Sequence, residues 1–151
     1  MNWKSEKDLL IDEEDDLRRY VRGELMNYYL YLHKWHVLES KRQSLKCSSG
    51  GSVIQMPDGA SDGKSPQQRM MDKDFELQEL QEPFEKRMRA IDRWVSVLTK
   101  PYYNVIKEYV MKNRCRNPRE VGFSLKLSEE AVRKQAERAI CQICSRNKKI
   151  L

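Results

Sequence analysis

Apolar residues recur at helical spacing along most of the chain. From about Leu9 to Lys46 they are four, four, three, four and three residues apart, which places them on one face of a helix. They are Leu17, Val21, Leu25, Tyr28, Leu32 and Trp35. The pattern predicts one long helix over this range, interrupted only by Gly23, which costs about 1 kcal/mol relative to Ala.

A second helical pattern runs from about Gln67 to Leu98. Its apolar positions form a heptad-like seam of Leu77, Leu80, Phe84, Met88, Ile91, Val95 and Leu98. Pro83 either kinks this helix or lies in the first turn of a new one. A seam this long needs a helical partner. The partner is either the first helix, in an antiparallel hairpin, or the same 77–98 seam in another subunit of a homo-oligomer.

The segment 48–66 separates the two patterns and is rich in Gly, Ser and Pro. This composition predicts a flexible loop, which as a coil spans roughly 25 Å and lets two long helices fold back on each other. The fold class is therefore all-α. We expect a helical scaffold at 1–98, either a long hairpin or a coiled coil, followed by a separate helical module at 99–151.

The last third of the chain predicts three shorter helices. Thr99 and Pro101 begin the first, which extends to about Lys112, and Asn117 with Pro118 begins the second. Ser128 is a suitable N-cap for the third. The predicted buried face of this third helix carries Val132, Ala136, Ala139, Ile140 and Ile143. Gly122 is a small residue where the last two helices would cross, and four apolar residues surround it: Val121, Leu125, Leu127 and Val132. The spacing predicts a helix-turn-helix.

In a helix-turn-helix, the second helix enters the major groove of DNA and presents its N-terminal residues to base edges. Arg and Lys can donate there to guanine, and Glu can accept from the cytosine amino group. The candidate base-reading residues are Ser128, Glu129, Glu130, Arg133 and Lys134. The candidate phosphate contacts are Arg116, Arg119, Lys126 and Arg138. The alternative is an ordinary helical hairpin with a solvated basic face.

Charge is unevenly distributed. The net charge is +6, but residues 100–151 contain 13 Lys/Arg against 5 Asp/Glu, a balance of +8, whereas residues 1–99 have a balance of −2. A basic C-terminal third suits contact with a polyanion.

Other chemistry has little support in the sequence. No strand followed by a Gly-rich loop suggests a nucleotide site, and both histidines lie in one predicted helix, so we expect neither an enzyme nor a cofactor. Cys141 and Cys144 have metal or redox spacing, and His33 with His36 could complete a zinc site, but small apolar packing explains the cysteines more simply. No apolar run approaches the roughly 20 residues of a membrane span. We expect a cytoplasmic protein with reduced thiols.

Residues 120–140 resemble the last two helices of sigma-factor region 4. The resemblance rests on Glu120, Val121, Leu125, Ser128, Val132 and the basic residues that follow. From about Asp16 onward, the layout is similar to that of phage late-gene regulators of the RinA and ArpU type. Their Gly-Gly/Pro/Ser loop is matched at 49–51, 56–57 and 65–66. The chain departs from the helix-turn-helix pattern at Gly122, usually Ala, at Lys126, usually Gly, and at Gln135, often apolar.

The resemblance implies a sequence-specific activator of phage or prophage late genes that binds double-stranded DNA and contacts host RNA polymerase in the bacterial cytoplasm. Two alternatives remain. One is a DNA-packaging protein of the small terminase kind, although such proteins tend to place the DNA module first. The other is a helical adaptor that binds a protein through its seam and uses no DNA.

Overall fold

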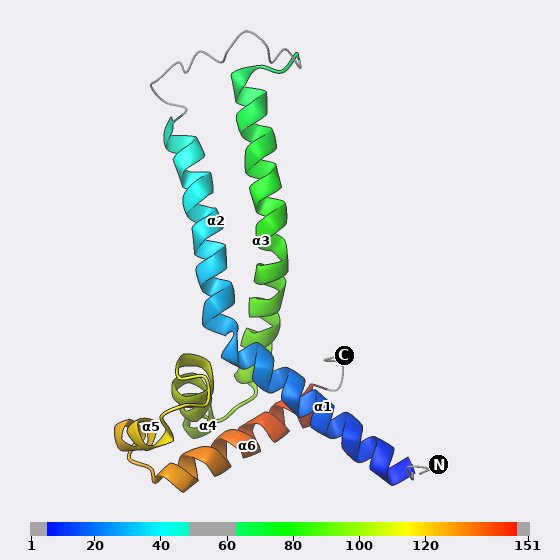
Figure 1. Ribbon diagram of the computed structural model, residues 1–151, viewed down its shortest axis with the longest axis vertical. Coiled ribbons are helices and arrows are strands. Elements are labelled where there is room, and N and C mark those ends of the chain that lie inside the picture. Colours follow the sequence, from blue (N-terminus) through cyan, green and yellow to red (C-terminus); the bar gives the residue numbers. More distant parts are fainter. Residues whose placement is uncertain (1–5, 49–62, 148–151) are drawn as a thin grey trace. The chain divides into compact units, whose positions relative to one another are not determined.

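The computed structural model describes residues 6–48 and 63–147, and in this part of the chain every regular element is a helix (Figure 1). The elements are α1 (Glu6–Met26), α2 (Tyr28–Ser48), α3 (Pro66–Ser96), α4 (Lys100–Val105), the π-helical η1 (Ile106–Lys112), α5 (Pro118–Leu125) and α6 (Glu129–Arg146). The all-α class is confirmed. Of the loop expected at 48–66, residues 49–62 lie outside the described residues.

The described residues form two compact units. One contains residues 6–29 and 87–147, that is, α1, the C-terminal part of α3 and every later helix. The other contains residues 30–48 and 63–86, which are most of α2 and the N-terminal part of α3.

The prediction of one continuous helix from Leu9 to Lys46 is wrong at a single residue. Asn27 separates α1 from α2, and its N–H donates to the carbonyl oxygens of Gly23 (3.1 Å) and Glu24 (3.2 Å). Asn favours turns because its side chain competes with backbone hydrogen bonding. The apolar spacing conceals the break, since one interrupting residue leaves the pattern of threes and fours almost unchanged.

α2 and α3 form a long antiparallel hairpin (Figure 1). The rings of Tyr31 and Phe84 lie 6.2 Å apart across it. α3 begins with a capping box, in which the Ser65 hydroxyl accepts from the Gln68 N–H (3.2 Å) and the Gln68 side chain accepts from the Ser65 N–H (3.1 Å). α3 then continues through Pro83 as one helix of 31 residues.

The α3 seam changes phase near its middle. Leu80, expected in the seam, is 57% exposed, whereas Gln81 is only 1% exposed. Leu77, Gln81 and Phe84 are spaced four and three residues apart, so Gln81 replaces Leu80 in the buried row. The expectation that Leu80 belongs to this row is therefore wrong.

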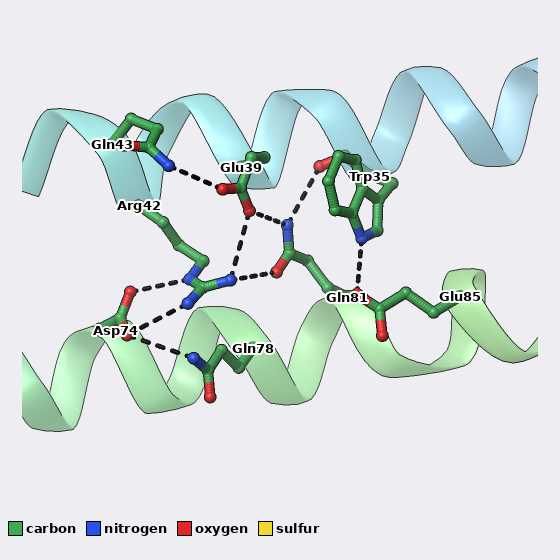
Figure 2. Close-up of polar contacts among 8 residues, drawn as sticks. All are labelled: Trp35, Glu39, Arg42, Gln43, Asp74, Gln78, Gln81 and Glu85. Atoms are coloured by element: carbon green, nitrogen blue, oxygen red, sulfur yellow. Dashed lines mark hydrogen bonds and ion pairs between the residues drawn. The ribbon is translucent and has the colours of Figure 1, made fainter.

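A polar network surrounds Gln81 inside the hairpin (Figure 2). The Gln81 amide nitrogen donates to Glu39 Oε2 (3.0 Å) and to the Trp35 carbonyl (3.3 Å), and Gln81 Oε1 accepts from Arg42 Nη1 (3.1 Å). Arg42 Nε also donates to Asp74 Oδ1 (2.8 Å). Because burying a polar group without a partner costs about 1–3 kcal/mol, these contacts allow Gln81 to occupy an apolar row.

The core of the other unit is apolar. α1 packs against α6 and η1, and α4 also packs against α6. The fully buried side chains on these helices include Val21, Leu25, Val105, Ile106, Val110, Val132, Ala139, Ile140 and Ile143. The buried face predicted for the last helix is therefore confirmed. α6 thus packs against several helices through its apolar face, while Arg133, Lys134 and Arg138 on the rest of its surface are exposed.

Candidate nucleic-acid interface

A tight connection joins α5 to α6 (Figure 1). The Leu127 N–H donates to the Gly122 carbonyl oxygen at 2.7 Å, which folds the connection back onto α5. Lys126 ends α5 in the left-handed conformation (φ 59°, ψ 42°), which glycine adopts more easily. The connection thus has the shape expected for a sharp turn between two helices, without the usual glycine at its strained position.

The start of α6 is well capped. Ser128 is its N-cap, and the Ser128 hydroxyl accepts a hydrogen bond from the Ala131 N–H at 3.1 Å. Glu129 and Glu130 occupy the first turn, where carboxylates interact favourably with the positive end of the helix. The predicted N-cap is confirmed.

All five candidate base-reading residues are exposed, at or just before the first two turns of α6. The two cations among them are paired with carboxylates one turn earlier. Arg133 Nη2 lies 2.9 Å from Glu129 Oε1, and Lys134 Nζ lies 3.0 Å from Glu130 Oε1. Exposed pairs of this spacing contribute only about 0.3–0.5 kcal/mol. A stronger acceptor could therefore replace the carboxylates at little cost.

The four candidate phosphate contacts are also exposed, and they come from different elements. Arg116 lies in the loop before α5, Arg119 in the first turn of α5, Lys126 in the connection and Arg138 in the middle of α6. The loop before α5 is held by hydrogen bonds from the Cys115 N–H to the Tyr109 carbonyl (2.9 Å) and from the Asn113 side chain to the Glu108 carbonyl (2.5 Å).

A shallow groove of about 690 Å³, which the sequence does not predict, lies between α4 and α6. It is lined by Tyr102, Lys134, Glu137, Arg138, Cys141, Gln142 and Ser145. Tyr102 is more than 30 positions from the other lining residues, so no local spacing relates them. Sequence reasoning also gave no role to Phe123 on α5, which is 90% exposed.

On its α1 side, α6 borders a smaller cavity of about 420 Å³ with several arginines. Their charges are largely compensated, because Arg18 contacts Asp15 (2.5 Å) and Arg22 approaches Glu137 (3.8 Å). Arg18 Nη1 also donates to the sulfur of Cys141 at 3.7 Å. Hydrogen bonds to Asp15 and Cys141 raise the pKa of Arg18 above its ordinary value.

The cysteines are free thiols. Burial raises the pKa of the Cys144 thiol, and likewise that of Cys115. Among residues 6–48 and 63–147, no group of three or more His, Cys, Asp and Glu side chains is arranged to hold a metal ion. None of the helices in those ranges combines the length and apolar character of a membrane span.

No protein-family model, curated protein or solved structure matches the chain.

Proposed function

We propose that the chain binds double-stranded DNA in a sequence-specific manner through α5, the connection and α6, acting as a helix-turn-helix regulator of phage or prophage late genes. One observation carries the proposal. The tight connection sets α5 against α6, and Arg133 and Lys134 lie exposed in the first two turns of α6. A recognition helix reaches base edges through exposed side chains in its N-terminal turns, so these two residues support the proposal.

The carboxylate pairs suggest how recognition proceeds. In the free protein, Glu129 pairs with Arg133 and Glu130 pairs with Lys134, one turn along the helix. On a cognate site, Arg133 and Lys134 exchange these partners for guanine O6 and N7, and a released glutamate accepts from a cytosine amino group. On this mechanism the target site contains G·C pairs where α6 enters the groove.

We expect activation to involve host RNA polymerase in the bacterial cytoplasm. Self-association through 77–98 would use the exposed side of this stretch, where Leu80 lies, because Phe84 already contacts Tyr31 of the same chain.

A protein adaptor is the second candidate function, and exposed apolar side chains on the hairpin favour it. Met71 and Phe75, one turn apart on α3, are 66% and 60% exposed. Paired exposed apolar groups are typical of surfaces that bind another protein. The packaging alternative would instead require ring-like oligomers, which sedimentation or light scattering would reveal.

The deciding experiment is selection of bound sequences from a random duplex library at low salt, followed by affinity measurements on the selected site. We expect Arg133→Ala with Lys134→Ala to abolish the preference for that site while helicity is unchanged. Lys73→Ala with Lys86→Ala on α3 is the matched control, because it also removes two exposed positive charges. Absence of any binding at low salt, where phosphate attraction is strongest, would exclude the DNA function and leave the adaptor.

A further inference from the structure

The groove between α4 and α6 lies on a surface continuous with the candidate reading end of α6. Lys134 belongs to both, and Arg138 and Gln142 continue along the helix from it at successive turns. Tyr102, from α4, lines the opposite wall. A molecule held by the first turns of α6 could therefore extend into this groove without leaving the protein surface.

The charges that line the groove leave one cation without a carboxylate. Lys134 is paired with Glu130 at 3.0 Å, and Glu137 approaches Arg22 of α1 at 3.8 Å. Arg138 has no ion-pair partner among the described residues. Counting the described residues alone, the groove thus presents a single uncompensated positive charge.

Neutral hydrogen-bonding groups surround that charge. Neither the Tyr102 hydroxyl nor the Gln142 side chain makes a hydrogen bond to another described residue, so both have donors to offer. The Ser145 hydroxyl already donates to the Gln142 carbonyl at 3.1 Å and is less available. One cation with neutral donors suits a ligand with a single negative charge and several acceptor oxygens.

We propose that this groove binds one phosphodiester of the DNA backbone, with Arg138 supplying the charge and Tyr102 and Gln142 supplying hydrogen bonds. A phosphodiester carries one negative charge, and a guanidinium can bind its oxygens in bidentate fashion. The inference rests on the proposed function and deepens it, because it predicts that the backbone leaves the reading end of α6 on the α4 side. Tyr102 and Gln142 are then positioning residues with no part in base reading.

The test uses the full chain and a duplex carrying its selected site. Arg138→Gln should lower the slope of log affinity against log salt by about 0.9, the value for one phosphate contact. Tyr102→Phe should weaken binding roughly five-fold, the value of one neutral hydrogen bond, with an unchanged slope. Arg93→Gln on α3, which removes an exposed positive charge away from the groove, should leave both quantities unchanged.

A scan of single neutral methylphosphonates along the duplex then identifies the phosphate. At the phosphate that Arg138 binds, the neutral substitution should weaken binding by the wild type. The same substitution should not weaken binding by Arg138→Gln, which already lacks this contact. If the wild type binds its site but Arg138→Gln keeps the full salt slope, the groove is not a phosphate site and the proposed function stands. If the wild type binds no DNA, the proposed function fails and the inference fails with it.

Discussion

The backbone carbonyl oxygen of Leu127 lies only 2.5 Å from the position that a Cβ atom would occupy on Gly122. The obstacle is backbone rather than a flexible side chain, and the Leu127 N–H is already bonded to the Gly122 carbonyl. Any side chain at position 122 would therefore push the connection away from α5.

Gly122→Ala should destabilise the protein by about 1–3 kcal/mol, as overpacked substitutions do, even though Ala favours helices. Gly23→Ala in α1 is the control, since nothing lies within 4 Å of its Cβ position. It should stabilise by up to about 1 kcal/mol. Urea unfolding followed by circular dichroism measures both changes, and a stabilised Gly122→Ala variant would contradict the close approach.

Lys126→Gly should raise stability by about 0.5–1 kcal/mol, because the left-handed backbone at this position is costly for a residue with a Cβ. If Lys126 also contacts a phosphate, the same variant should lower the salt slope of DNA binding by about 0.9. Lys126→Gln separates the two effects, since it removes the charge and retains the backbone strain. Its stability should match the wild type while its salt slope falls.

Gln135→Leu should stabilise the protein by about 1 kcal/mol. The Gln135 side-chain oxygen is buried and has no hydrogen-bond partner in the part of the chain that the structure describes, and an unsatisfied buried acceptor costs about 1–3 kcal/mol. Gln67→Leu, at an exposed position on α3, is the comparison and should change stability little. Thermal unfolding of the two variants measures the difference. If Gln135→Leu and Gln67→Leu had equal melting temperatures, the unsatisfied oxygen of Gln135 would not be destabilising.

Arg42→Met should destabilise the hairpin by about 2 kcal/mol, because it removes a partner from Asp74, Glu39 and Gln81 together. Adding Asp74→Leu and Gln81→Leu should restore most of this loss, since apolar side chains then replace all three of these polar residues and the partly exposed Glu39 keeps its hydrogen bond from Gln43. Amide hydrogen exchange in α2 and α3 measures the hairpin directly. A triple variant less stable than Arg42→Met alone would show that the polar contacts stabilise the hairpin beyond offsetting the cost of burying their own groups.

The hairpin should lose stability in acid. The Arg42 hydrogen bond lowers the pKa of Asp74, and hydrogen bonds from Gln81 and Gln43 lower the pKa of Glu39. A carboxyl with a lowered folded-state pKa contributes stability above its unfolded pKa of about 4, and this contribution is lost as pH falls through the folded value. Urea unfolding of wild type and Asp74→Asn at pH 6, 4 and 3 tests this. The variant should lose less stability than the wild type, and parallel losses would contradict the assignment.

Much of the helical fold follows from the spacing of apolar residues. The seam of α3 apart from Leu80, the buried face of α6 and the Ser128 cap were predictable, because each depends on residues within a few turns of one another. The break at Asn27 was not, since one inserted residue barely disturbs the pattern. The burial of Gln81 in place of Leu80 could not be predicted either, because the hydrogen-bond partners of Gln81 lie on α2, about 40 residues earlier.

Only part of the candidate site could be predicted from the sequence. Its exposed residues follow from the local pattern of α5 and α6. The groove wall at Tyr102 requires α4 to pack against α6, and that contact has no signature in either segment. The pairing of Arg133 with Glu129 has a sequence signature in its four-residue spacing, which could have been recognised before the structure.

If the protein binds DNA as proposed, the pairing of Glu129 with Arg133 and of Glu130 with Lys134 affects how fast it finds and leaves a site. The reading end of α6 carries no net charge, so on an unrelated duplex the attraction comes only from flanking residues such as Arg119 and Lys126. Residence on wrong sites is then short, because the contacts that would lengthen it form only when bases displace the glutamates. The search for a target would consequently be fast, and discrimination would be expressed mainly in the dissociation rate.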